Sequence, residues 1–157
     1  MYIGYTDGSY KSSTGQGGYA SIITLNNEVV EKLYQGFTNT TNNRMELLAV
    51  LETLKYFKTA TAIHIFSDSQ YVVNSLNQGH VEKWFLNNDL SKKNLDLWFE
   101  VIDLLKLHKV TFEWVKGHSR HKMNEMANLY AQHAADCINP IEDKGFSQKF
   151  ISKNNDS

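Results

Sequence analysis

Cysteine, proline and arginine are scarce in this chain of 157 residues, which contains one, one and two of them respectively. Because Cys137 has no partner, no disulfide can form within the chain, and a reducing compartment is expected. No segment approaches the roughly 20 consecutive apolar residues that a membrane-spanning helix needs. Residues 1–7 contain neither a basic region nor a long apolar run. We therefore expect no signal peptide, no membrane contact and a cytoplasmic location.

An excess of positive charge is missing as well. The formal net charge is −1 and the calculated pI is about 6.6, so electrostatics alone do not indicate a nucleic-acid partner. Any such function has to be argued from motifs. The share of hydrophobic residues, 41%, is that of an ordinary soluble globular protein. We expect one domain over residues 1–140, a partly disordered tail over residues 141–157, and a monomer.

The apolar residues follow strand spacing in some segments and helical spacing in others, which predicts an α/β protein. Segment 80–94 predicts a short helix followed by a turn. The unbroken apolar run at 62–66 is typical of a strand that is buried on both faces. We expect strands at residues 2–6, 19–25, 29–37, 62–66 and 110–115, and further helices at residues 42–57, 70–76, 95–107 and 123–137.

Oxygen-bearing side chains occur at the ends of several of these elements. Asp7 and Asp68 each follow a predicted strand, Glu46 lies in the first turns of a helix, and Asn128 lies in the last helix. Each one alone is more often a turn former or a helix cap. Oxygen ligands from separate elements are, however, what a site for hard divalent cations such as Mg²⁺ requires. Together they predict a metal site, with an amide where a fourth carboxylate would be expected.

His118 follows the last predicted strand in a loop beside Gly117. A histidine in such a loop can transfer protons at neutral pH, because its unperturbed pKa is about 6.5. The other five histidines, at positions 64, 80, 108, 121 and 133, are expected to be structural or surface residues.

Five sequence strings resemble type 1 ribonuclease H, and they occur in the order found in that family. The similarity extends from about Tyr2 to Ala135, and the third string is the most specific. The strings are Tyr5-Thr6-Asp7-Gly8-Ser9, Gly17-Gly18-Tyr19-Ala20, Thr40-Thr41-Asn42-Asn43-Arg44-Met45-Glu46-Leu47, Ser67-Asp68-Ser69-Gln70-Tyr71-Val72 and Trp114-Val115-Lys116-Gly117-His118.

The resemblance implies a five-stranded mixed sheet with helices on both faces, and an endonuclease that cuts the RNA strand of RNA/DNA hybrids. Family members use two Mg²⁺ or Mn²⁺ ions and leave 5′-phosphate and 3′-hydroxyl ends. The positions that match the metal-binding catalytic residues are Asp7, Glu46, Asp68 and Asn128. His118 matches a loop histidine that assists proton transfer or product departure.

The same resemblance assigns substrate contacts. Amide side chains that meet the minor groove of the hybrid, where 2′-hydroxyls mark RNA, match Asn42, Asn43 and Gln70. Thr41 matches a contact to a phosphate of the DNA strand, and Ser9 is assigned to substrate binding as well. Ser13 stands where the family often has a substrate-contacting Asn, so that contact is in doubt.

Two departures leave alternatives open. Asn128 can coordinate a cation through its amide oxygen but adds no negative charge, so weaker metal binding is expected. The alternative to an active nuclease is a module that binds hybrids without cutting them, with Asn128 as a natural or an engineered change. The basic, tryptophan-rich insertion of some family members is shortened here at residues 80–96, which predicts weaker, salt-dependent hybrid binding. An integrase- or resolvase-like DNA enzyme is disfavoured, because those lack the Asn-Asn-Arg-Met-Glu string.

Overall fold

A mixed β-sheet forms the centre of the computed structural model, which describes residues 1–87, 93–117 and 121–146. The sheet has six strands in the order β5-β4-β1-β2-β3-β6. Antiparallel pairs join β1 to β2 and β2 to β3, and parallel pairs join β1 to β4, β4 to β5 and β3 to β6. The strands are β1 (Tyr2–Lys11), β2 (Gln16–Leu25), β3 (Glu28–Thr38), β4 (Ala62–Ser67), β5 (Lys109–Trp114) and β6 (Ile141–Glu142).

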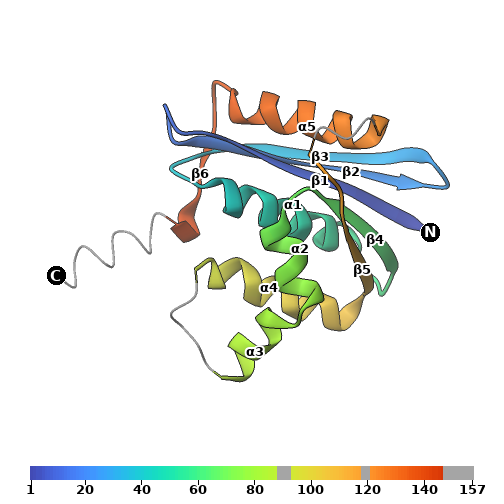
Figure 1. The fold of residues 1–157 in the computed structure, drawn as a ribbon. Helices are drawn as coiled ribbons and strands as arrows, with labels where there is room; N and C mark the ends of the chain where they lie inside the picture. Colours follow the sequence, from blue (N-terminus) through green and yellow to red (C-terminus); the bar gives the residue numbers. More distant parts are fainter. Residues whose placement is uncertain (88–92, 118–120, 147–157) are drawn as a thin grey trace.

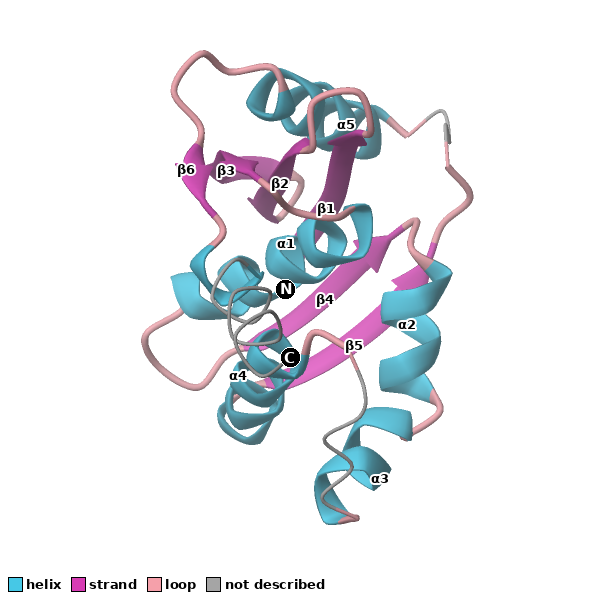
Figure 2. Cartoon of the chain, turned by 90° about the vertical axis from the view of Figure 1, so that its left-hand side faces the viewer, coloured by secondary structure: helices cyan, strands magenta, loops and turns pink. Residues whose placement is uncertain are grey.

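Helices cover both faces of this sheet (Figure 1). Helix α5 packs over β1, β2 and β3 on one face, while α1 packs over β1 and β2 on the other and contacts α4 and α2. Figure 2 shows α2 alongside β5 at the far end of the sheet. The helices are α1 (Asn42–Tyr56), α2 (Gln70–Asn77), α3 (His80–Leu86), α4 (Leu95–Leu107) and α5 (Lys122–Ala135).

Local sequence accounts for the turns and helix starts. Asn26 and Asn27, between β2 and β3, both have positive φ, at 52° and 68°. Asparagine tolerates this left-handed conformation well, and it suits a tight hairpin turn. The hydroxyls of Thr41 and Ser69 cap α1 and α2 by accepting hydrogen bonds from the backbone N–H groups of Arg44 and Val72, both at 3.2 Å.

The main core lies between the sheet and the α1–α4 layer. Its largest fully buried member is Trp98, whose indole N–H donates to the hydroxyl of Tyr71 at 2.9 Å. The fully buried aliphatic side chains around it include Leu47, Val50, Leu51, Leu54, Ile63, Ile65 and Val101. Leucines spaced for one face of a helix therefore bury α1 against β1, β2 and α4, as their periodicity predicts.

The α/β class, with helices on both faces, is confirmed, but the sheet has six strands rather than five. The short helix expected within 80–94 is α3. The expectation that the fourth strand is buried on both faces is wrong: Ile63 and Ile65 are buried, whereas His64 and Phe66 are half-buried. Helix α5 packs mainly over β1 to β3 on that side, so β4 is only partly covered there.

Part of the expected tail is built into the fold. Strand β6 pairs with Phe37 and Thr38 of β3, and the side chain of Asp143 is buried behind it. A two-residue strand carries too little periodic signal to be seen in a sequence. Residues 147–157 lie outside the described residues, so the disorder expected for them stays a prediction. Within the described ranges, no helix is long and apolar enough to cross a membrane.

Helix α5 and β3 approach each other most closely at Gly36. A Cβ atom there would overlap the carbonyl oxygen of Ala134 and lie 2.6 Å from the Sγ of Cys137. The overlapping atom belongs to the backbone, so the contact cannot be relieved by a change of rotamer. Glycine at this position lets the small residues of α5 lie directly on the sheet.

Gly36→Ala is expected to lower the free energy of unfolding by about 1–3 kcal/mol, because the helix has to move away from β3. Urea unfolding followed by circular dichroism would measure the change. Val30→Ala serves as a control on the same strand, since that side chain is 43% exposed and its loss should matter little. Equal stability of the two variants would contradict the close packing inferred at Gly36.

Candidate active site

Three carboxylates from separate elements meet just beyond the point where the parallel pairing of β1 with β4 ends. The parallel pairing of β1 with β4 ends at Tyr5 and Phe66, and Asp7 and Asp68 each lie two residues beyond that pair. Asp7 is inside β1, which continues to Lys11 as a hairpin with β2, rather than at the strand end that we predicted. Glu46 reaches the same place from the second turn of α1.

Asp7, Glu46 and Asp68 can each supply one oxygen to a common group whose atoms all lie within 4.8 Å of one another. The residues Asp7 and Glu46 are only 7% and 4% exposed, and Asp68 is half-buried. The structure therefore brings together the three acids that the sequence nominated.

Gly8 makes this convergence possible. A Cβ atom at this position would lie 2.6 Å from the backbone nitrogen of Glu46 and 2.8 Å from the carbonyl carbon of Met45. Any larger residue would thus push the start of α1 away from β1. The amide N–H of Gly8 also donates to Oδ1 of Asp7 at 2.9 Å. One glycine therefore sets the separation of two carboxylates and orients one of them.

The described residues supply too few hydrogen-bond donors to satisfy the oxygens of these carboxylates. Within the described part of the chain, two buried side-chain atoms accept no hydrogen bond, Oε2 of Glu46 and Oδ1 of Asp68. Burial, and then the nearby charge of Asp68, raises the pKa of Asp7 to about 7. Burial, followed by the charges of Asp7 and Asp68, raises the pKa of Glu46 well above its ordinary value. A cation placed among these oxygens would reverse both shifts.

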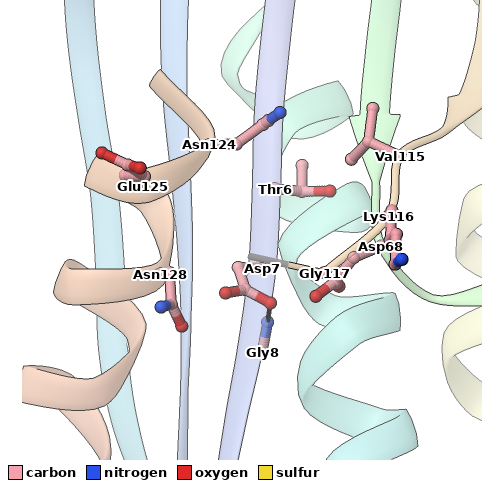
Figure 3. A pocket seen from close by; sticks show the side chains of 10 residues that line it. All are labelled: Thr6, Asp7, Gly8, Asp68, Val115, Lys116, Gly117, Asn124, Glu125 and Asn128. Carbon is pink, nitrogen blue, oxygen red and sulfur yellow. Dashed lines mark hydrogen bonds between the residues drawn. The ribbon is translucent and has the colours of Figure 1, made fainter. Parts of the chain in front are cut away.

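Asn128 lies on the wall of the same pocket (Figure 3). The pocket is lined by Thr6, Asp7, Gly8, Asp68, Val115, Lys116, Gly117, Asn124, Glu125 and Asn128. In Figure 3 the side chain of Asn128 is on the side of α5 that faces Asp7, whereas Glu125 points away. The amide oxygen of Asn128 accepts a hydrogen bond from Nε2 of Gln132 at 3.3 Å. Its second lone pair can still face the pocket.

Several pocket residues were not singled out from the sequence, and two of them bear on the chemistry of the pocket. Lys116 brings a positive charge to the pocket, and Asn124 lies one helical turn before Asn128. The i, i+4 spacing of the two asparagines was the available signal, because it places both on one face of a helix. Lys116 was visible only as part of the last family string.

His118 lies outside the described residues, so its role stays a prediction. The loop that leads to it is anchored beside the carboxylates. The indole N–H of Trp114 donates to the backbone oxygen of Asp68 at 3.0 Å, and the N–H of Val115 donates to the backbone oxygen of Ser67 at 2.9 Å. Gly117, the last described residue before His118, lines the pocket.

None of the five residues assigned to substrate contact is among the described residues that line the pocket. Asn42 and Asn43 are exposed at the start of α1, and Gln70 is exposed at the start of α2. The hydroxyl of Thr41 caps α1, and Ser9 is half-buried on β1 two residues beyond Asp7. Their contacts with a hybrid remain predictions.

Comparison with known proteins gives a consistent result. The family model described as RNase H matches residues 1–136. A protein named Ribonuclease H from Caldicellulosiruptor saccharolyticus is 42% identical over 134 residues, which are 82% of this chain and 91% of that protein. Another protein of that name, from Pseudoalteromonas atlantica, is 40% identical over 146 residues, 90% of this chain and 95% of that one.

Among solved structures, the chain is similar to LC9-RNase H1, described as a type 1 RNase H with the type 2 active-site motif. The two share a TM-score of 0.75 and 28% identity over 86% of this chain and 72% of that chain. The match to the family model spans most of the chain, and the curated relatives are matched along nearly their whole length. The chain therefore belongs to the RNase H family.

Proposed function

We propose that this protein hydrolyses the RNA strand of RNA/DNA hybrids in a reaction that depends on divalent cations and leaves 5′-phosphate and 3′-hydroxyl ends. The observation that carries the proposal is the convergence of Asp7, Glu46 and Asp68 within 4.8 Å. The family match and the relatives named Ribonuclease H support the choice of reaction.

The residues present fit a site for two Mg²⁺ or Mn²⁺ ions. The donor set consists of carboxylate and amide oxygens, which hard cations prefer. Oε2 of Glu46 and Oδ1 of Asp68 are buried acceptors that accept no hydrogen bond within the described residues. The residues that would hold the ions are Asp7, Glu46, Asp68 and Asn128. Bound there, divalent cations would favour ionisation of an attacking water and stabilise negative charge on the leaving 3′ oxygen.

The protein itself contributes position, charge and proton transfer. Asp7 and Glu46 are held in place by β1 and α1, so their oxygens need not reorganise when substrate arrives. Lys116 lines the pocket, so its positive charge would lie near the negatively charged scissile phosphate. His118, in the following loop, would exchange protons with the reacting groups.

Hybrid recognition would use the rim around this pocket. The exposed amides of Asn42, Asn43 and Gln70 can both donate to and accept from 2′-hydroxyls. Thr41 and Ser9 would complete the contacts, with the hydroxyl of Thr41 shared between the helix cap and a DNA phosphate. This arrangement gives one reason for a preference for hybrids over duplex DNA.

Cleavage of a 5′-labelled RNA annealed to complementary DNA tests the proposal. Incubation with Mg²⁺ or Mn²⁺ should release fragments with 3′-hydroxyl and 5′-phosphate ends, while duplex DNA and duplex RNA stay intact. Chelation of the metal should stop the reaction. An absence of cleavage with both metals would refute the proposed activity.

The repulsion among the carboxylates predicts a specific pH dependence for the metal-free protein. The pKa of Asp7 is about 7 in the folded state, against about 3.9 when unfolded. Between these values the folded protein retains a proton that the unfolded protein has lost, so stability falls as the pH rises. Asp7→Asn should remove this loss and stabilise the metal-free protein at pH 8 by roughly 2–4 kcal/mol, while abolishing cleavage with Mg²⁺.

Unfolding by urea in EDTA, at pH 5 and at pH 8, measures this effect. Asp103→Asn is the matched control, because the Asp103 side chain is 75% exposed and its ion pair with Lys106 lies on the protein surface. A pH dependence that is identical in parent, Asp7→Asn and Asp103→Asn would contradict the raised pKa of Asp7.

Asn128→Asp tests the fourth position. The added charge should tighten binding of the cations, so that the Mg²⁺ concentration for half-maximal cleavage falls about 3–10-fold. The parent should cleave at saturating Mg²⁺, because an amide oxygen can still coordinate. A metal titration of the cleavage rate measures both. If only the Asp variant cleaved, the parent would be a hybrid-binding module rather than a nuclease.

A further inference from the structure

A second charged cluster lies on the first turn of α1, two residues before Glu46. Its centre is Arg44, which is only 2% exposed. The guanidinium donates to Asp143 through Nε at 2.7 Å and Nη2 at 3.0 Å. It also donates to Asp96 through Nη1 at 2.9 Å and Nη2 at 2.8 Å. One buried cation thus joins α1, the start of α4 and the segment after β6.

Asp143 holds more than the arginine. Its Oδ2 also accepts a hydrogen bond from the hydroxyl of Thr40 at 2.8 Å. Thr40 and Arg44 are the residues immediately before and after the turn 41–43, which carries three of the residues assigned to hybrid contact. A single carboxylate therefore fixes both ends of that turn. We call Thr40, Arg44, Asp96 and Asp143 the Arg44 network.

The metal ligand Glu46 follows two residues after Arg44, on the opposite side of the helix. Residues of a helix that are two positions apart point about 200° apart around its axis. Arg44 accordingly reaches α4 and the C-terminal segment, while Glu46 reaches Asp7 over Gly8, where the backbones are in close contact. The first turn of α1 is held between these two attachments, so movement at one displaces the other.

Arg44 stays protonated because both of its carboxylate partners, Asp96 and Asp143, are present. Burial on its own lowers the pKa of Arg44, but the hydrogen bonds with Asp96 and Asp143 raise it above the ordinary value. Bidentate pairs of this kind are geometrically specific, and lysine cannot reproduce them. Loss of one carboxylate would leave a buried cation half-neutralised, which favours movement of the turn towards water.

We propose that Asp143 is a positioning residue for the active site, acting through Arg44 and Thr40 on the metal ligand Glu46 and on the hybrid-binding turn 41–43. The proposal rests on the proposed function for the identity of the substrate. Its structural part, the control of Glu46 by Asp143, does not depend on that substrate.

Asp143→Asn, Arg44→Lys and the double variant test this role. Each single variant should lower kcat on the hybrid at saturating substrate by roughly 10- to 100-fold, the scale for a small misplacement of catalytic groups. Mg²⁺ binding measured by calorimetry without substrate should weaken, and amide hydrogen exchange in residues 42–46 should speed up. The double variant should be no worse than either single one, because both break the same network.

Val101→Ala is the stability control, since Val101 is fully buried in α4 and is not a member of the Arg44 network. It should lower stability yet leave the Mg²⁺ affinity and exchange of residues 42–46 unchanged. If Asp143→Asn behaved like this control, with kcat and Mg²⁺ affinity within about twofold of the parent, the network would be purely structural and the proposal would be overturned.

These measurements distinguish failure of the proposed function from failure of the positioning role of Asp143. A parent that does not cleave hybrids would refute the proposed function, while calorimetry and hydrogen exchange would still decide whether Asp143 positions Glu46. If Asp143→Asn failed to fold, Asp96→Asn would replace it, because the Asp96 side chain is 41% exposed and its loss is better tolerated. The same changes in Mg²⁺ affinity and exchange are expected, and their absence would overturn the proposal.

Discussion

Electrostatic repulsion among three neighbouring carboxylates, two of them buried, is the constraint that the rest of this structure has to satisfy. Asp7, Glu46 and Asp68 are brought together although burial and mutual charge oppose it. Such an arrangement persists only if the surrounding frame is stiff. Here the frame consists of the parallel pairing of β1 with β4 and the close contact of α1 with Gly8. The packing of β1, β4 and α1 thus offsets the repulsion among these carboxylates, which a bound cation would relieve.

A cluster with the opposite arrangement of charge lies a short distance along the same helix. At Arg44 one buried cation is neutralised by two carboxylates, and the donors and acceptors satisfy one another. In the group formed by Asp7, Glu46 and Asp68, two buried oxygens accept no hydrogen bond from the described residues, and a neutralising cation would have to come from outside. The Arg44 network is therefore neutralised when the chain folds, whereas the group of three acids would be neutralised only if it bound a cation.

The sequence located the chemistry better than it located the architecture. Asp7, Glu46 and Asp68 stood in specific strings, and the structure brings them together as expected. The end of β1 was placed too early, because hairpin pairing with β2 carries the strand past Asp7 to Lys11. Asp143 was not recognised at all. Its partners are Thr40 and Arg44, about 100 residues earlier, and such a pairing leaves no local pattern.

Burial was also harder to predict than periodicity. Segment 62–66 has no polar alternation apart from His64, yet only one face of β4 is fully covered. The reason is the position of α5, which a strand's own residues do not reveal. The last helix was expected to extend to residue 137, but α5 ends at Ala135. Cys137 therefore lies beyond the helix, where it is half-buried beside Gly36.

The pairing of β6 with β3 has a consequence for synthesis of the protein. Strand β3 is complete once residue 38 has been made, but the strand that covers its outer edge, Ile141–Glu142, is made more than 100 residues later. Until then the nascent chain presents an unpaired edge, which is a template for association with other strands. Ribosome-bound intermediates of this protein should therefore depend more on chaperones than the finished fold does.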